Sequence, residues 1–217
     1  ILDLATGVGA MAAELRQRFP DRVLVGVDRS REQLLAAARQ PGLLRVQADG
    51  TKLPFPDDTF RFVHASWLLE HVPDAVAILK ECRRVVEPDG VVQFTEVENA
   101  SMLFHPPQPE AEKVFAALNA AQQRFGGDPY IGRRLHGLMR QAGFTDVEVK
   151  PVTLHGHAGR PAFFADLVEE FWRIFESVRE SVPRELDVDR AIAELQALPQ
   201  VEGASMTYTF FVARARR

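Results

Sequence analysis

The sequence has little cysteine, no excess of basic charge and no long apolar run. Cys82 is its only cysteine, which excludes an intrachain disulfide and a cysteine-based zinc cluster and favours a reducing, cytoplasmic location. The formal net charge of -4 argues against a nucleic-acid partner, because phosphate backbones call for a basic face. No apolar run reaches the roughly 20 residues that cross a bilayer. We therefore expect no membrane span and no bound metal.

The length and the remaining composition are those of one large globular domain, or of one domain with an extra subdomain. The chain has 217 residues, of which 46% are hydrophobic and 26% are charged, which is enough to bury a substantial core. Ile1 lies inside a predicted strand, so we expect that further chain precedes it. No feature of the sequence predicts the oligomeric state.

Short apolar strands alternate with amphipathic helices along most of the chain. Such alternation predicts an α/β fold in which helices cover both faces of a mainly parallel sheet. Two further helices, Ala162–Val182 and Asp187–Leu198, come before the last strand and predict a lid. The predicted strands are Ile1–Leu4, Arg22–Asp28, Leu43–Ala48, Phe60–Ser66, Val91–Val97, Thr145–Leu154 and Met206–Arg214.

A glycine-containing loop joins the first predicted strand to the first helix. Its glycines, Gly7 and Gly9, let backbone N–H groups approach a ligand and leave the helix N-terminus open. This indicates a nucleotide-like ligand. The spacing Gly7-x-Gly9-x-x-Ala12, with Asp28 further on, also fits the looser fingerprint of NAD-binding proteins. The loop alone leaves both readings open.

Three aspartates lie at or near the carboxyl ends of the first three strands, where open α/β sheets bind ligands. They are Asp3, Asp28 and Asp49. Asp3 lies within a strand, where an unpaired carboxylate is costly to bury. A buried acid at that place favours a ligand that carries a positively charged amine.

The first 150 residues or so resemble the class I S-adenosylmethionine-dependent methyltransferases. The similar segments are LDLATGVG, VGVD, QADGTKLPFPDDTF, SWLLEHVPD and GLMRQAGFTDVEV. Two positions depart from the family pattern: Ala5 replaces the first glycine of the loop, and Arg61 replaces an acid at the start of the fourth strand. The resemblance implies a Rossmann-like three-layer αβα fold. Its sheet has seven mostly parallel strands, the last one antiparallel, and a helical insertion precedes that strand.

The resemblance also implies S-adenosylmethionine as cofactor and assigns residues to it. Asp3 and the glycine loop would surround the methionine part, Asp28 would bind the ribose, Asp49 and Gly50 would meet the adenine, and Ser66 would lie near the reactive end. The full set of predicted cofactor residues is Asp3, Ala5, Thr6, Gly7, Gly9, Asp28, Arg29, Asp49, Gly50, Ser66 and Trp67.

Methyl transfer from a sulfonium needs an aligned, water-poor pocket, and it needs a general base only if the acceptor must lose a proton. His71 and His105 are the candidate bases. The alternative for His71 is that it caps or packs the next helix, and the alternative for His105 is that it is a solvated loop residue. Glu96 and Glu98 could contact a polar acceptor, but strand alternation turns one of them away. His155 and His157 lack the further ligands of a zinc site.

An aromatic stripe follows the first helix of the insertion and is interpreted either as core or as the wall of an apolar acceptor pocket. It comprises Phe163, Phe164, Leu167, Val168, Phe171, Trp172 and Phe175. We predict an S-adenosylmethionine-dependent methyltransferase acting on a small, partly apolar metabolite. An NAD-dependent oxidoreductase and a non-catalytic cofactor-binding partner are the alternatives. The predicted divisions are a cofactor-binding core at 1–154, a lid at 155–205 and a final strand at 206–217.

Overall fold

The computed structural model describes residues 1–217 and divides them into two compact units. The first unit comprises Ile1–Glu96, Ile131–Lys150 and Phe211–Arg217, and the second comprises Val97–Tyr130 and Pro151–Phe210. These units divide the chain differently from the predicted boundaries at 154 and 206. The assignment of residues 155–205 as a lid stays a prediction.

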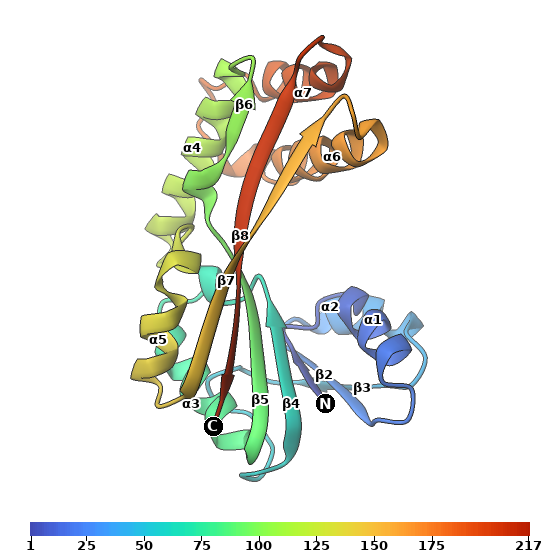
Figure 1. Ribbon diagram of the computed structural model, residues 1–217, viewed down its shortest axis with the longest axis vertical. Helices are drawn as coiled ribbons and strands as arrows, with labels where there is room; N and C mark the ends of the chain where they lie inside the picture. The colour runs from blue at the N-terminus through green and yellow to red at the C-terminus, as the bar shows by residue number, and fades with distance from the viewer. The chain divides into compact units, whose positions relative to one another are not determined.

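The first unit is built on a mostly parallel sheet (Figure 1). In the order β3-β2-β1-β4-β5, each neighbouring pair of strands is parallel. Strand β8 follows β5, runs antiparallel and also pairs with β7. This is the predicted Rossmann-like arrangement. The strands are β1 (Leu2–Leu4), β2 (Leu24–Asp28), β3 (Leu43–Gln47), β4 (Phe60–Ser66), β5 (Val86–Val97), β7 (Thr145–His157) and β8 (Ser205–Arg216).

Helices α1 (Ala10–Arg18) and α2 (Arg31–Ala36) contact β2, and α3 (Ala75–Val85) contacts α5 (Leu135–Gln141). Ser30 with Gln33 three residues later is the sequence pattern of a helix cap, and the Ser30 hydroxyl does accept the backbone N–H of Gln33 at 3.3 Å. A cap of this kind satisfies one of the free N–H groups of the first turn. Short 3₁₀ helices lie at Ala37–Arg39, Leu69–His71, Asn99–Ser101, Ile131–Arg134, Arg179–Ser181 and Leu198–Gln200.

The predicted start of β5 at Val91 is wrong by five residues. The strand begins at Val86, directly after α3, and Val86 pairs with Phe60 across an irregularity in the β4–β5 register. Val86 is fully buried. Burial of this valine in the sheet therefore overrides the turn signal of Pro88-Asp89-Gly90, which the strand absorbs as an irregular stretch.

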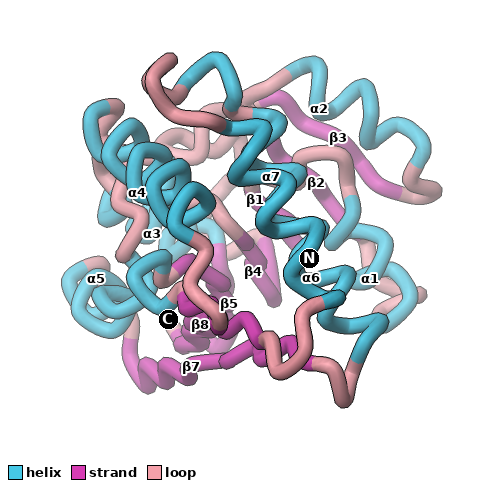
Figure 2. The backbone as a smooth tube through the Cα atoms, turned by 90° about the horizontal axis from the view of Figure 1, so that it is seen from above, coloured by secondary structure: helices cyan, strands magenta, loops and turns pink.

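The second unit packs three helices around its own apolar core. Helix α7 (Val188–Ala197) lies against both α4 (Pro109–Arg124) and α6 (Pro161–Ser177) (Figure 2). A short strand that the sequence did not predict, β6 (Leu103–His105), pairs antiparallel with β8. None of the helices in either unit combines the length and the apolar character needed to cross a bilayer.

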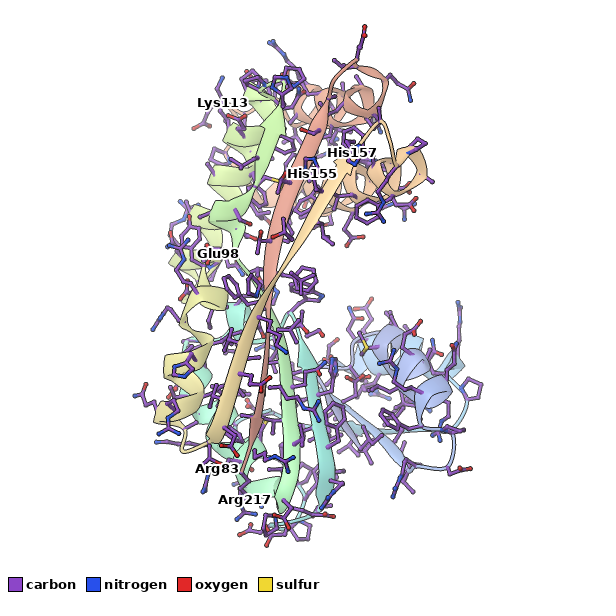
Figure 3. All side chains as sticks on the ribbon, viewed as in Figure 1. Arg83, Glu98, Lys113, His155, His157 and Arg217 are labelled. Atoms are coloured by element: carbon purple, nitrogen blue, oxygen red, sulfur yellow. The ribbon has the colours of Figure 1, made fainter.

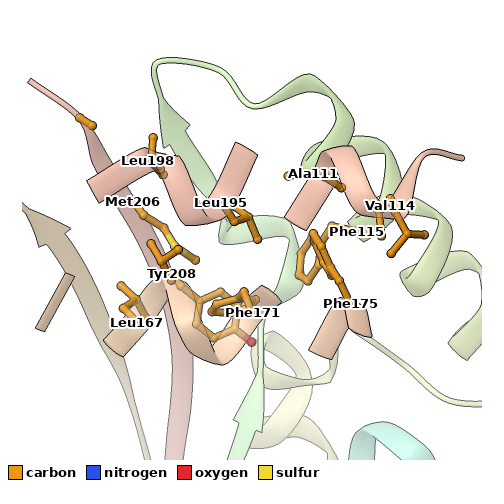
Figure 4. Packing of buried hydrophobic residues seen from close by; sticks show 14 of the residues in the cluster. Ala111, Val114, Phe115, Leu167, Phe171, Phe175, Leu195, Leu198, Met206 and Tyr208 are labelled. Atoms are coloured by element: carbon orange, nitrogen blue, oxygen red, sulfur yellow. The ribbon is translucent and has the colours of Figure 1, made fainter. Parts of the chain in front are cut away.

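The aromatic stripe of α6 forms part of this core (Figure 4). Phe171 makes an edge-on contact with Tyr208 of β8, with ring centroids 5.0 Å apart, and a similar contact with Phe115 of α4 at 5.9 Å. Phe163 and Trp172 are partly buried against the same cluster. The buried members of the stripe are Phe164, Leu167, Val168, Phe171 and Phe175. The core interpretation therefore holds for these five side chains.

Candidate cofactor site

The loop after β1 has an unusual backbone in which three residues take positive φ angles. Ala5, Gly7 and Gly9 have φ angles of 57°, 54° and 81°. Glycine adopts this left-handed region at no steric cost, whereas alanine does so at some cost. Gly9 then begins α1 with no side-chain cap. No side chain caps the first N–H groups of this helix, and such an N-terminus favours a carboxylate.

Asp28 fastens the end of β2 to this loop. One carboxylate oxygen accepts the Gly7 N–H at 2.9 Å, and the other accepts the Ser30 N–H at 2.8 Å. The side chain is partly exposed, and each oxygen keeps a second lone pair that can accept from a ribose hydroxyl.

Asp49 follows Ala48, whose backbone N–H donates to the backbone oxygen of Asp28 at 3.2 Å. The C-terminal ends of β2 and β3 therefore lie side by side. One oxygen of the exposed Asp49 carboxylate accepts both the hydroxyl and the N–H of Thr51, at 2.7 and 2.8 Å. The hydroxyl and then the N–H hydrogen bond hold the pKa of Asp49 below its usual value. Asp49 therefore keeps a charged oxygen that can accept from an amine.

The glycine after Asp49 allows a close approach to α3. A Cβ added to Gly50 would come within 2.8 Å of the Ile78 side chain. A larger residue would therefore require the terminal methyl group of Ile78 to shift. Gly50 therefore lets the loop after β3 pack closely against α3, and its place beside the adenine stays a prediction.

Asp3 is buried, and both of its oxygens have protein partners. One oxygen accepts the Thr6 hydroxyl at 2.6 Å, and the other lies 3.0 Å from His64 Nδ1. The second ring nitrogen of His64 lies 3.2 Å from the Ser66 hydroxyl. Sequence reasoning missed His64. The strand register pairs Asp3 with His64 and places both on one face of the sheet, and this register is not visible in the sequence.

The chain turns sharply after β4 and is held by a second buried acid. Trp67 has a φ angle of 55°, and its N–H donates to the Thr95 oxygen at 2.9 Å. Glu96, which is fully buried, accepts the N–H groups of Leu68, Leu69 and Glu70. Burial, together with the charge of Glu70, raises the pKa of Glu96 to about 8. The role of this residue in shaping the loop was not predicted.

Comparison with known proteins identifies the family. A model of the methyltransferase domain matches residues 2–94. The chain is 33% identical over 169 residues to the ubiquinone/menaquinone biosynthesis C-methyltransferase of Desulfotalea psychrophila, covering 71% of this chain and 69% of the relative. It is 30% identical to the demethylmenaquinone methyltransferase of Anoxybacillus flavithermus, with 70% and 72% of the two chains covered. The chain belongs to the class I S-adenosylmethionine-dependent methyltransferases.

A solved structure shows the same fold as this methyltransferase. The phosphoethanolamine N-methyltransferase 2 of Haemonchus contortus, crystallised with S-adenosyl-L-methionine, aligns with a TM-score of 0.59 and 18% identity. The alignment covers 99% of this chain and 48% of that one. The family model and the named relatives make this methyltransferase an enzyme with S-adenosylmethionine as its cofactor. The oxidoreductase and the non-catalytic alternatives are set aside.

The two predicted bases of the methyltransferase lie in different units. His71 ends the Leu69–His71 turn, and its exposed ring lies 3.7 Å from the Glu70 carboxylate. His105 is exposed at the end of β6 in the second unit, opposite Ser205. The first unit contains all eleven predicted cofactor residues. The roles of His71 and His105 as bases stay predictions.

The paired histidines of β7 have neighbours of their own in the methyltransferase. The rings of His155 and His157 lie 5.3 Å apart (Figure 3). His155 Nδ1 lies 2.8 Å from the Thr207 hydroxyl, and His157 Nδ1 accepts the Gly159 N–H at 3.1 Å. No group of three or more His, Cys, Asp or Glu side chains in the chain is arranged to hold a metal ion.

Proposed function

We propose that the first unit binds S-adenosylmethionine with the residues predicted from the sequence and that its methyl group passes to a small, partly apolar acceptor. The observation that carries the proposal is the hydrogen bond between Asp28 and the Gly7 N–H. It joins an acid of β2 to the open loop of β1 and leaves acceptor sites for a ribose. The proposed residues are Asp3, Ala5, Thr6, Gly7, Gly9, Asp28, Arg29, Asp49, Gly50, Ser66 and Trp67.

Each part of the cofactor has a matching group in the first unit. The uncapped N-terminus of α1 favours the carboxylate of the aminoacyl part, Asp28 accepts from the ribose hydroxyls, and Asp49 accepts from the adenine amine. Asp3 does not bind the cofactor directly, because its two oxygens already accept from Thr6 and contact His64. Its contribution to the binding of the amine is the negative charge that it adds to this part of the site.

An aromatic quinol is the first acceptor to test. Relatives of this chain are named as methyltransferases of ubiquinone, menaquinone and demethylmenaquinone. The bound cofactor supplies an electrophilic methyl group, so a ring carbon that attacks it must be electron-rich, as in the reduced quinol and not in the quinone. The Trp67 side chain, 42% exposed at the end of β4, offers an aromatic surface for such a ring. The negative net charge supports an acceptor other than nucleic acid.

The test combines a binding measurement with an assay of turnover. The protein is titrated with S-adenosylhomocysteine by calorimetry and then incubated with S-adenosylmethionine and a short-chain demethylmenaquinol under reducing conditions. We expect binding, and mass spectrometry should detect a singly methylated ring. The same quinone kept oxidised is the matched control and should stay unmethylated.

The two halves of the proposal fail separately. Absence of S-adenosylhomocysteine binding would overturn the cofactor site. Binding without methylation of the quinol, in a preparation that methylates another small phenol or amine, would overturn only the quinol assignment.

A further inference from the structure

Three side chains form a continuous hydrogen-bonded line from the interior of the first unit to its edge. His64 Nδ1 lies 3.0 Å from a carboxylate oxygen of Asp3, and His64 Nε2 lies 3.2 Å from the hydroxyl of Ser66. We call this line the Asp3–His64–Ser66 chain. Asp3 and His64 are each 2% exposed, whereas Ser66 is partly exposed. Ser66 is therefore the only member that can meet a bound molecule directly.

The carboxylate sets the direction of every hydrogen in this chain. An ionised carboxylate only accepts, so the Thr6 hydroxyl and His64 Nδ1 must both donate to Asp3. The neutral imidazole then has no hydrogen on Nε2, and the Ser66 hydroxyl must donate to that nitrogen. The two lone pairs of the serine oxygen are left to accept from a ligand.

Of the two residues paired with His64 on the neighbouring strands β1 and β5, only one is charged. The register places Asp3 of β1 on one side of it and the uncharged Gln93 of β5 on the other. A proton that reaches His64 is therefore stabilised by the Asp3 carboxylate 3.0 Å away.

Ser66 lies where a ligand of the sheet is expected. It is the last residue of β4, and its neighbour β1 runs into the glycine loop at the same edge. Ligands of open α/β sheets bind at the carboxyl ends of the strands. The exposed Trp67 follows directly. The serine oxygen is thus placed between the proposed cofactor loop and the proposed aromatic surface.

We propose that Ser66 is a catalytic residue that takes the proton of the methyl acceptor, and that His64 and Asp3 are positioning residues acting through it; the proposal rests on the function proposed above. An acceptor phenol, whose pKa is about 10 when unperturbed, gives its O–H proton to Ser66 as the serine proton passes to His64 Nε2. The ring carbon forms a bond to the methyl carbon, the C–S bond breaks, and its electron pair stays on sulfur. The ring C–H proton then moves to the ring oxygen, and His64 releases its proton to solvent through Ser66.

The first experiment compares turnover of demethylmenaquinol by wild type, Ser66→Ala, His64→Gln and Ser66→Thr. We expect Ser66→Ala to lower kcat at neutral pH by at least about 100-fold, a larger factor than any rise in the Kd of S-adenosylhomocysteine that the loss of a proposed cofactor contact causes. Alkaline pH should restore the rate, because the phenol then ionises without help. Ser66→Thr should keep much of the rate. The exposed His136 of α5 supplies the control His136→Gln, which should match wild type.

Two results would overturn the proposal. One is that Ser66→Ala raises only the KM of S-adenosylmethionine and leaves kcat and its pH profile unchanged, which would make the serine a cofactor ligand alone. The other is that His71→Gln abolishes turnover while Ser66→Ala does not, which would make His71 the base.

A second experiment needs no methyl acceptor, so its result does not depend on the proposed quinol substrate. Nitrogen-15 NMR of histidine-labelled protein with S-adenosylhomocysteine should show His64 with its hydrogen on Nδ1, protected from exchange in wild type. Asp3→Asn should abolish that signal. A hydrogen on Nε2 in wild type would mean that Ser66 accepts from the ring, and it would refute the chain as a proton path.

Discussion

The carboxylate of Glu96, at the end of β5, accepts the backbone N–H of Leu69 at 2.8 Å. The N–H groups of the residues on either side, Leu68 and Glu70, donate to the same carboxylate at 3.2 and 3.3 Å. A single fully buried side chain thus satisfies three successive donors of an irregular loop. This loop follows Ser66 and Trp67, so Glu96 fixes the chain beside the proposed reactive end.

Glu96 should make the protein less stable as the pH rises. Its pKa in the folded chain, about 8, lies above the ordinary value of 4.5, so the folded state holds the proton more tightly than the unfolded state. The resulting stabilisation is complete below about pH 4.5 and is lost as the pH rises through about 8. The free energy of unfolding should fall by at most about 1.4 kcal/mol per pH unit from this group. Urea unfolding between about pH 5 and about pH 9 measures the slope.

The amide of Glu96→Gln does not titrate, so in this variant the free energy of unfolding should lose most of its dependence on pH. Glu148→Gln is the matched control, because the Glu148 side chain is 71% exposed, and its slope should equal that of wild type. An unchanged slope in Glu96→Gln would assign the pH dependence to another group.

Replacing Asp28 should weaken cofactor binding without unfolding the chain. In Asp28→Asn one of the two N–H donors, that of Gly7 or of Ser30, faces an amide NH₂ instead of an oxygen, and the ribose loses a charged acceptor. We expect the Kd of S-adenosylhomocysteine to rise on the order of 10- to 100-fold by calorimetry. Asp21→Asn, in the exposed turn before β2, should bind as wild type does. Equal affinities for the two variants would refute the ribose assignment.

The sequence predicted what depends on neighbours along the chain and missed what depends on distant partners. Alternating strands and helices, the Ser30 cap and the Gly7 loop all follow from local spacing. Strand β6 has three residues, one of them the exposed Leu103, and exists because it pairs with β8. No local periodicity marks so short an element.

The site shows the same division. Asp28 was predicted because its motif fixes its place after β2. His64 lies 61 residues from Asp3, and Glu96 lies 27 residues from Leu69. Their roles depend on the strand register and on burial, neither of which a single sequence displays.

Gly7→Ala should separate backbone strain from loss of binding. Gly7 has a φ angle of +54°, and an added Cβ would find its nearest neighbour, Gln33 Oε1, at 3.9 Å. Gly203, in the turn before β8, has a φ angle of +74° with nothing within 4 Å of such a Cβ. Both alanine variants should therefore lose roughly 1–2 kcal/mol of stability through strain alone.

Only Gly7→Ala should also weaken S-adenosylhomocysteine binding, by about tenfold or more, corresponding to about 1.4 kcal/mol. Gly203→Ala is the control for strain, and its Kd should stay at the wild-type value. A similar loss of affinity in both variants would mean that reduced stability, and not the loop itself, causes the effect.

Truncating a residue of the aromatic stripe of α6 should lower the free energy of unfolding. Phe175 is 1% exposed and packs among the buried residues of the second unit, with its ring centroid 6.4 Å from that of Phe115. Phe175→Ala leaves a cavity in a close-packed core and should lower the free energy of unfolding by about 3–5 kcal/mol. Phe125, at the end of α4, is 85% exposed, so Phe125→Ala should stay within about 0.5 kcal/mol of wild type. Urea unfolding of both variants measures these changes. If Phe175→Ala is as stable as wild type but has a raised KM for the acceptor, the aromatic stripe belongs to the acceptor pocket instead.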